Sequence, residues 1–441
     1  MACSRGAQKK ERRSLRILIN SINFSPEPIS TGKYAGEMAE WLALRGHEVR
    51  VVTTAPHYPQ WKIFPGYSAW KFSRDTGRQR VKSEGSLEVF RCPVWVPRTP
   101  QGWKRIAYLG SFSLSSWPMM LRQIPWCPDV VLLVEPTLLC SPQVLCVSRI
   151  SRAVAWLHVQ DFEVDVAFQL KHFSSLRLKR WIQWFERLVL GRFDRVSSIS
   201  ERMVNRLSAK GVDSARTSLF PNWVDTSLIY PLPGASALRK AFNIPNETTV
   251  ALYSGNMGTK QGLGLLVETS ERLRLRSDIL FCFCGDGPYR EILIRRTMGF
   301  KNVKLLPLQP LDKLNDLLNA ADIHLLPQVA DAEDLVMPSK LTGMMASGRA
   351  VVATARPETQ IYKVLQGKGL VCPPGDSESF AAAVVQLADS PVLRREMGIA
   401  ARKHALANMS RDEILANFEL TLMEACGQAV EFHHREPSSA T

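Results

Sequence analysis

The sequence predicts an α/β protein built from two doubly wound domains with parallel sheets. Short apolar runs alternate with segments of helical periodicity along the chain, as strands and helices do in this class. The Pro-rich segment 221–234 interrupts this alternation once, and the alternation then restarts. The length of 441 residues suits two or three domains of ordinary size.

In the first half, the expected strands are short and apolar throughout, which is typical of buried parallel strands. They are predicted over residues 15–20, 47–54, 88–92, 130–134, 153–158 and 195–199. A helix is expected over 33–45, with Tyr34, Met38 and Trp41 on its apolar side and Gly46 at its end.

In the second half, the same alternation continues to the last helix. Strands are predicted over 249–253, 279–284, 303–306, 323–326, 350–354 and 370–372. Helices are predicted over 263–275, 311–320, 340–346, 378–387 and 411–424. We therefore expect a disordered basic N-terminus (1–14), a first domain (15–225), a second domain (226–410), and a C-terminal helix (411–430) that packs back on the first domain.

The net charge of +15 is confined to the first half of the chain. Residues 1–225 carry 33 Lys and Arg against 18 Asp and Glu, whereas residues 226–441 carry 23 of each. This asymmetry indicates a large anionic partner for the first half, such as a membrane surface, a polyanion or nucleic acid. No zinc finger or other nucleic-acid signature is recognised, so nucleic acid is not expected.

Two stretches that combine tryptophan with basic residues favour an anionic membrane surface. They contain Trp103, Lys104 and Arg105, and Arg177, Lys179, Arg180, Trp181 and Trp184. Such residues suit the headgroup layer. The alternative is an ordinary surface helix whose apolar stripe packs into the core. Because no run is apolar enough to span a bilayer and no signal peptide is recognised, a cytoplasmic location at the inner membrane face is expected.

Two loops of the second half carry residues suited to binding an anion. Gly255, Gly258, Lys260 and Gly262 lie between a strand and a helix, an order that favours a phosphate site over a turn with a solvated lysine. Pro338 begins a helix and leaves the amides of Ser339, Lys340 and Leu341 unpaired within it. A routine helix start is an equal alternative for the second loop.

Two loops of the first half are weaker candidates. Gly32 precedes a helix, where amide groups attract anions, although a simple turn is as probable from the pattern. His158 follows a strand, where it can donate to a substrate hydroxyl with Asp161 orienting it, or serve as a structural histidine. No Cys or His cluster has the spacing of a zinc site, so no metal is expected.

Together these segments resemble family 4 retaining glycosyltransferases. The motifs are S-G-N-x-G-x-K-Q-G-L from Ser254, P-S-K-L from Pro338, H-V-Q-D from His158, and N-F-S-P-E, G-K-Y and G-H-E-V-R-V-V-T near the N-terminus. The segments 57–61 and 91–97 strengthen a narrower likeness to colanic-acid and related polysaccharide-biosynthesis glycosyltransferases. The likeness runs from about Arg16 to Glu424 and implies the GT-B fold, with two Rossmann-like domains facing a central cleft.

The resemblance also implies roles for matching residues. Lys260 would hold the donor diphosphate, and His158 would contact the transferred sugar with Asp161 in support. Gly32 would let the N-terminal loop close over the phosphates. The implied donor-binding set is Gly32, Gly255, Asn256, Lys260, Gly285, Asp286, Asp334, Pro338, Ser339, Lys340 and Leu341.

Two departures from the family pattern concern the same donor site. Asn256 stands where many members have an arginine that helps to neutralise the leaving diphosphate. Leu335 and Gly343 stand where the family has paired glutamates, the second of which holds the ribose. Glu333, Asp334 and Glu358 are the candidates to replace part of that function.

The implied reaction is a retaining transfer from a nucleotide diphosphate sugar to a polyprenyl-diphosphate-linked glycan. The sugar would be fucose or an N-acetylated deoxyhexosamine, in bacterial exopolysaccharide, lipopolysaccharide or O-antigen biosynthesis, with no cofactor or metal. The rival readings are a nucleotide-sugar epimerase or phosphorylase on the same fold, and a non-catalytic sugar- or polymer-binding protein.

Overall fold

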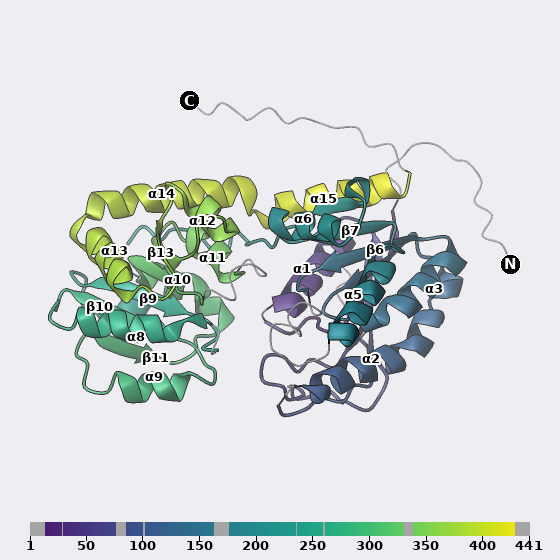
Figure 1. Cartoon of the computed structure of the whole chain (residues 1–441), viewed down its shortest axis with the longest axis horizontal. Coiled ribbons are helices and arrows are strands. Elements are labelled where there is room, and N and C mark those ends of the chain that lie inside the picture. Colours follow the sequence, from purple (N-terminus) through teal and green to yellow (C-terminus); the bar gives the residue numbers. More distant parts are fainter. Residues whose placement is uncertain are drawn as a thin grey trace. The chain divides into compact units, whose positions relative to one another are not determined.

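The computed structural model describes residues 14–28, 30–75, 85–99, 102–162, 176–234, 236–258, 261–329 and 338–427. The chain forms two compact units (Figure 1). Unit 1 comprises Met1–Phe220 and Leu415–Thr441, and unit 2 comprises Pro221–Ile414. Among the described residues, no helix combines the length and apolar character needed to cross a bilayer.

Unit 1 is built on an eight-stranded sheet in the order β3-β4-β2-β1-β5-β6-β7-β8, in which only β3 runs antiparallel to its neighbour. Its strands are β1 Arg16–Ser21, β2 Glu48–Thr54, β3 Ser73–Asp75, β4 Ser86–Cys92, β5 Val130–Val134, β6 Val154–Val159, β7 Arg195–Ser198 and β8 Thr217–Leu219. Its helices are α1 Ser30–Leu44, α2 Trp103–Leu121, α3 Ser141–Ser151, α5 Leu176–Leu190 and α6 Glu201–Ala209, with 3-10 turns η1 Ile124–Trp126, η2 Leu138–Cys140 and η3 Ser214–Arg216.

Unit 2 is built on a six-stranded, all-parallel sheet in the order β11-β10-β9-β12-β13-β14. Its strands are β9 Thr249–Ser254, β10 Ile279–Cys284, β11 Val303–Leu306, β12 Ile323–Leu326, β13 Ala350–Thr354 and β14 Leu370–Cys372. Its helices are α7 Ala237–Ala241, α8 Leu263–Arg272, α9 Arg290–Arg296, α10 Leu314–Ala320, α11 Lys340–Ala346, α12 Gln360–Leu365, α13 Ser377–Asp389 and α14 Pro391–Asn408, with η5 Leu311–Lys313.

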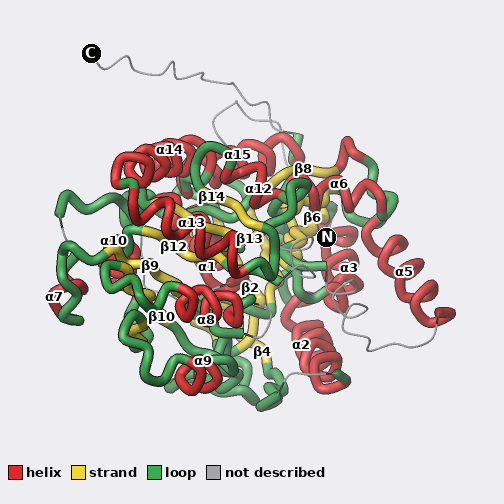
Figure 2. Tube along the Cα trace, turned by 60° about the vertical axis from the view of Figure 1, so that its left-hand side comes forward, coloured by secondary structure: helices red, strands yellow, loops and turns green. Residues whose placement is uncertain are grey.

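Both faces of the unit 2 sheet are covered, which is why its strands are apolar throughout. In β10, Phe281 and Phe283 join a core cluster with residues of α8 and α13. Cys282 and Cys284, on the other face of the same strand, pack with residues of α7 and α10. Figure 2 shows the helices outside the strands.

The last helix, α15 Arg411–Ala425, begins in unit 2 and continues in unit 1. In unit 1 its Phe418 stacks on Phe220, with ring centroids 3.8 Å apart. Its Glu419 lies 3.0 Å from Nε2 of His47 and 3.2 Å from Nε of Arg45.

The predicted strands are confirmed within two residues at each end, but two helix predictions need correction and α14 was missed. The helix expected over 263–275 ends at Arg272, where the chain turns. The helix expected over 311–320 is divided into η5 and α10. The 18-residue α14 was not predicted, although it has a capping Ser390, whose hydroxyl accepts from the Leu393 amide, and a proline at its first position.

Candidate active site

The strand order of unit 2 reverses at β9, whose neighbours are β10 on one side and β12 on the other. Open parallel sheets bind ligands outside the carboxyl ends of their strands at such a reversal. The loops that leave β9 and β10, and helix α11 that follows β12, lie at this edge. The sheet topology therefore places the candidate site of unit 2 at the carboxyl end of β9, beside these loops and the start of α11.

Three glycines allow the loops after β9 and β10 to meet backbone to backbone. Gly255, Gly285 and Gly287 have φ angles of 129°, 153° and 148°. A Cβ atom on Gly285 would lie 1.9 Å from the carbonyl oxygen of Gly255, and one on Gly287 would lie 2.7 Å from that of Met257. The Met257 amide donates to the Asp286 carbonyl at 2.8 Å. This contact leaves no room for side chains at Gly285 and Gly287.

The ammonium of Lys340, at the start of α11, reaches this glycine-rich edge. Its Nζ lies 3.1 Å from Oη of Tyr253, 3.0 Å from Oε1 of Gln261, and 4.4 Å from the centroid of the Tyr253 ring. Burial lowers the pKa of Lys340 to about 8 and raises that of Tyr253. The site therefore contains a desolvated cation held by uncharged groups.

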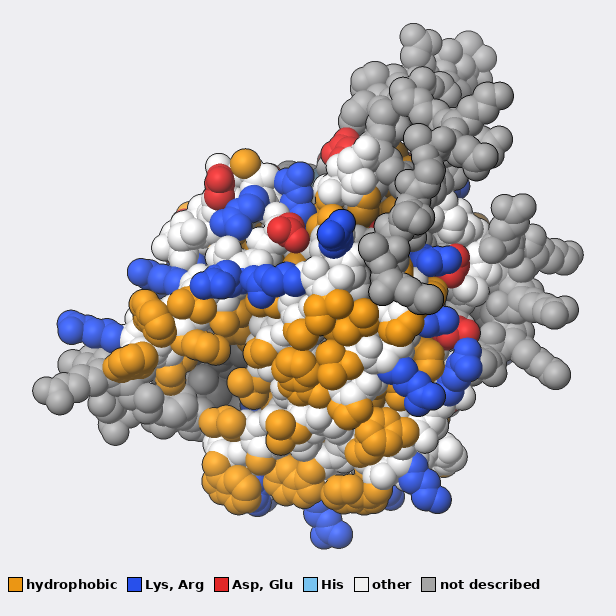
Figure 3. Space-filling view, turned by 90° about the vertical axis from the view of Figure 1, so that its right-hand side faces the viewer, with side chains coloured by type: hydrophobic (Ala, Val, Ile, Leu, Met, Phe, Trp, Pro, Cys, Tyr) orange, Lys and Arg blue, Asp and Glu red, His pale blue; other side chains and the backbone are white. Residues whose placement is uncertain are grey.

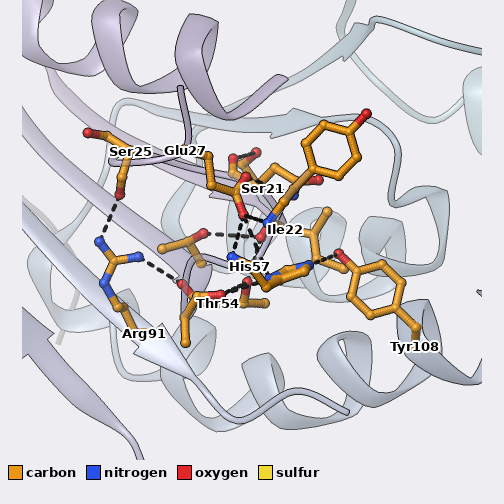
Figure 4. Close-up of polar contacts among 12 residues, drawn as sticks. Ser21, Ile22, Ser25, Glu27, Thr54, His57, Arg91 and Tyr108 are labelled. Carbon is orange, nitrogen blue, oxygen red and sulfur yellow. Dashed lines mark hydrogen bonds and ion pairs between the residues drawn. The ribbon is translucent and has the colours of Figure 1, made fainter. Parts of the chain in front are cut away.

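In unit 1, the corresponding loop after β1 is organised by Glu27, whose side chain is 2% exposed. Its Oε1 accepts from the amides of His57 and Tyr58, both at 2.9 Å, and its Oε2 accepts from Nδ2 of Asn23 at 2.8 Å (Figure 4). Burial raises the pKa of Glu27, although these hydrogen bonds oppose the shift. A Cβ on Gly32 would lie 2.6 Å from Oε2, so the start of α1 requires glycine here.

His57 and Arg91 connect this loop to neighbouring elements (Figure 4). Nδ1 of His57 donates to the Ala55 carbonyl at 2.8 Å, and Nε2 lies 2.8 Å from the hydroxyl of Tyr108 on α2. Arg91 on β4 donates to the carbonyls of Thr54 and Ser25, both at 2.8 Å. The loops after β1 and β2 are therefore fixed by buried polar contacts.

His158 lies at the end of β6 and is 3% exposed. Its Nδ1 is 3.0 Å from Oγ of Ser197, and its Nε2 is 3.3 Å from the Gln160 side-chain amide. Burial lowers the pKa of His158 to about 3, so the imidazole is neutral at physiological pH.

Asp161 lies close enough to Tyr58 to influence its ionisation. Burial raises the pKa of Tyr58, and the charge of Asp161 raises it further while Arg105 lowers it. The charge of Asp161, in the loop after β6, therefore acts on a residue of the loop after β2.

Comparison with known proteins identifies the family. Residues 31–223 match the model of the glycosyl transferase 4-like domain, and residues 248–390 match that of glycosyl transferases group 1. The chain is 37% identical, over 92% of its length and 98% of the relative, to the putative colanic acid biosynthesis glycosyl transferase WcaI of Escherichia coli K12. The chain belongs to the family 4 glycosyltransferases.

Solved structures show the same fold for this glycosyltransferase. Sucrose-phosphate synthase of Thermosynechococcus elongatus matches with a TM-score of 0.72 and 16% identity, over 94% of this chain and 99% of that one. Anabaena HepE, crystallised with UDP and glucose, matches with a TM-score of 0.65 and 16% identity, over 93% of this chain and 100% of that one. The fold is GT-B, as the sequence predicted.

Eight of the predicted donor-binding residues lie among the described residues of unit 2. The loops after β9 and β10 hold Gly255, Asn256, Gly285 and Asp286, and the start of α11 holds Pro338, Ser339, Lys340 and Leu341. Asn256, Asp286 and Ser339 are exposed, and Oδ1 of Asp286 accepts from the Gly287 amide at 2.8 Å. Lys260, Glu333, Asp334 and Leu335 lie outside the described residues.

One predicted phosphate donor needs correction. The Leu341 amide donates to the Pro338 carbonyl at 3.0 Å, because the turn that begins α11 already starts at Pro338. It is therefore not unpaired, unlike the prediction. Gly343, where the family has a glutamate, packs toward α10, since a Cβ there would lie 3.4 Å from Cδ1 of Leu318. Glu358 is exposed in the loop after β13.

Two features of these sites were missed by sequence reasoning. Glu27 was read only as part of a motif, although a glutamate between two prolines after a buried strand was a usable signal. Lys340 was assigned a role through its backbone amide alone, whereas its side chain extends to Tyr253 on β9. Sequence spacing does not show such a contact between residues 87 positions apart.

Proposed function

We propose that this glycosyltransferase moves a sugar, with retention, from a nucleotide diphosphate sugar to a polyprenyl-diphosphate-linked glycan in the synthesis of a bacterial exopolysaccharide. The observation that carries the proposal is the glycine-lined edge of unit 2, where the loops after β9 and β10 and the start of α11 lie at the reversal of strand order. The name of the WcaI relative, a colanic acid biosynthesis glycosyl transferase, supports a role in polysaccharide synthesis. The structures of HepE in complex with UDP support a nucleotide donor.

In the proposed reaction, the bond between the anomeric carbon and the diphosphate breaks, and an acceptor hydroxyl oxygen bonds to that carbon and loses its proton. Negative charge grows on the departing diphosphate, so preorganised donors and cations at the edge of unit 2 lower the barrier. Lys260 and the amides of Ser339 and Lys340 are proposed contributors, with no metal or cofactor required.

His158 and Asp161 are proposed contacts of the transferred sugar. The contact of His158 Nε2 with Gln160, at 3.3 Å, is long, and a sugar hydroxyl can replace it. The neutral imidazole suits hydrogen bonding to a hydroxyl and does not act as a cation.

Thermal stabilisation by UDP-, GDP-, ADP- and TDP-sugars tests the donor, with Lys260→Ala as the control. We expect one nucleotide to stabilise the wild type and to lose most of its effect on the variant. Incubation with that donor and a polyprenyl-diphosphate oligosaccharide should then yield a longer glycan with the donor's anomeric configuration. Conversion of the donor sugar without an acceptor would favour the epimerase or phosphorylase, and binding without any turnover would favour a binding protein.

We further propose that the acceptor lipid is reached because α2 lies in the surface of an anionic membrane at the inner face of the cell membrane. Residues 106–121 of this helix carry no charge, whereas Lys104 and Arg105 precede them and Arg122 follows. The exposed apolar residues Trp103, Ile106, Leu114 and Leu121 lie on one side of the helix. Figure 3 shows the face at the right-hand side of Figure 1, on which hydrophobic side chains gather with Lys and Arg around them.

The second predicted membrane helix, α5, also exposes apolar residues. Trp181 is 68% exposed, and Trp184, Phe185 and Leu188 are exposed as well. Val189, on the same helix, is buried. The side chains of Arg177 and Lys179 lie outside those described, and Arg180 is exposed.

Flotation with vesicles that contain anionic lipid tests this membrane contact. Leu114, 74% exposed on α2, is changed to Glu, and the control is Leu275→Glu, at a leucine that is 90% exposed in unit 2. We expect the α2 variant alone to lose flotation, because a carboxylate is repelled by anionic lipid. Equal flotation of the two variants would contradict the assignment to α2, and loss in Trp184→Glu alone would assign the contact to α5.

A further inference from the structure

Lys340 has an unusual environment for a lysine in this protein. Lys210, another lysine with little exposed surface, pairs with the carboxylate of Glu186 at 2.5 Å. The Lys340 ammonium instead contacts a phenol hydroxyl, an amide oxygen and an aromatic face, and no ion pair joins it to another described residue. A desolvated cation without a counter-charge is costly, so a fold keeps one where an anion binds.

The ammonium also retains hydrogen-bonding capacity. It has three N–H donors, of which Tyr253 and Gln261 accept two. The Tyr253 hydroxyl in turn donates to the Asn256 carbonyl at 2.6 Å, which fixes its lone pairs toward Lys340. None of the other described residues accepts the third N–H, which can therefore donate to an oxygen of a ligand.

The approach to this N–H passes Gly255. A Cβ on Gly255 would lie 3.5 Å from Nζ and 3.7 Å from Cε of Lys340. Because glycine has no such atom, the space beside the ammonium at the carboxyl end of β9 holds no side chain from residue 255. A ligand that lies along the exposed loop residue Asn256 would therefore meet no side chain of residue 255 on its way to the cation.

We propose that the Lys340 side chain, rather than only its backbone amide, binds a phosphate oxygen of the donor's nucleoside diphosphate. This inference rests on the proposed nucleotide-sugar donor and adds a cation next to Asn256. Tyr253 and Gln261 are positioning residues that hold the ammonium in place before the nucleotide arrives. A phosphate in this position supplies a counter-charge that none of the described residues provides.

The test compares the affinities of a nucleoside, its monophosphate and its diphosphate by isothermal titration calorimetry, with the base that the thermal panel selects. The variants are Lys340→Met and Lys340→Arg. The matched control is Lys304→Met, because the Lys304 ammonium also donates to a neutral group, the Phe242 carbonyl, in the same unit. Lys340→Gln, which keeps a donor toward Tyr253 without the charge, replaces the Met variant if the latter does not fold.

We expect Lys340→Met to weaken diphosphate binding by about 10- to 100-fold, the range for a lost charged hydrogen bond, and nucleoside binding by less than about threefold. Lys340→Arg should recover most of the loss, and Lys304→Met should bind as the wild type does. Wild-type diphosphate affinity in Lys340→Met, or an equal loss for nucleoside and diphosphate, would overturn the inference and leave the proposed donor intact. If the wild type binds no nucleotide, the proposed function fails and the inference fails with it.

Discussion

Removing the Glu27 carboxylate should destabilise unit 1 more than any other single change in the loop after β1. In Glu27→Ala, the amides of His57 and Tyr58 and Nδ2 of Asn23 lose the acceptors that now lie at 2.8–2.9 Å. An unsatisfied buried donor costs about 1–3 kcal/mol, so the two backbone amides alone give about 2–6 kcal/mol. That is a large part of the roughly 5–15 kcal/mol by which domains are stable.

Glu27→Gln is the matched variant, because it keeps one oxygen for the two backbone amides. Its new amide group can donate to Asn23 once the Asn23 amide turns over, so no donor needs to be left unpaired. The neutral side chain also removes the cost of a buried charge. We therefore expect a free energy of unfolding within about 1 kcal/mol of the wild type at neutral pH.

The two variants also differ from the wild type in their pH dependence. The pKa of Glu27 in the folded protein is raised above its ordinary value of 4.5, so the folded state favours the protonated carboxyl. Its contribution to stability is complete below pH 4.5 and is lost as the pH rises through the folded pKa. The wild type should therefore lose stability relative to Glu27→Gln above pH 4.5.

Urea unfolding followed by circular dichroism, repeated between about pH 4 and pH 8, measures both effects. The reasoning is refuted if Glu27→Ala costs less than about 1 kcal/mol, or if Gln is as harmful as Ala. The first result would mean that the three donors find other partners. The second would mean that the charge itself, and not the acceptor geometry, stabilises the loop.

Two other predictions concern a glycine and the buried histidines. Gly285→Ala should abolish nucleotide-induced thermal stabilisation, because its Cβ would lie 1.9 Å from the Gly255 carbonyl oxygen. The control is Gly299→Ala, where φ is 83° and no atom lies within 4 Å of the new Cβ. This control should lower the free energy of unfolding by only about 1 kcal/mol in melting experiments. Nitrogen NMR should find His158 and His324 neutral from pH 8 to pH 5, since burial lowers the pKa of each to about 3. Because the pKa of each histidine is lower in the folded protein than its ordinary value of 6.5, the free energy of unfolding should fall as the pH falls from 6.5 toward 3. His158→Gln should reduce that loss, and an acid transition unchanged by the substitution would contradict the prediction.

Apart from β3 and β8, which were not predicted, the strands were predictable because local sequence determines them. Apolar runs such as Ile279–Cys284 are buried on both faces, so every position selects an apolar residue. Helix ends were less predictable, because they depend on capping and turns. The Leu341 amide illustrates this, since a hydrogen bond to Pro338, only three residues earlier, removed it from the predicted phosphate donors.

The candidate site was predictable as a set of loops but not as a set of side-chain contacts. Glycines after strands mark where a ligand approaches, and Gly255 and Gly285 lie there. The Lys340–Tyr253 contact depends on α11 and β9 coming together at the reversal of strand order, and the Glu27–His57 contact depends on the adjacency of β1 and β2. Such contacts follow from topology, which residue spacing alone does not specify.

The uneven charge of the two halves of the chain fits the two anionic ligands proposed above, because the nucleoside diphosphate would contact buried groups and the membrane would contact exposed ones. A nucleoside diphosphate at the edge of unit 2 would meet a few desolvated groups such as Lys340, which needs no excess of surface charge, and residues 226–441 are neutral overall. A membrane would instead meet exposed residues such as Arg122, and residues 1–225 carry the whole excess of 15 positive charges. Because salt screens exposed charges strongly and desolvated ones weakly, raising NaCl from about 50 to 500 mM should abolish vesicle flotation and reduce nucleotide affinity much less. Equal sensitivity of both would mean that Lys340 is not shielded from solvent when the nucleotide binds.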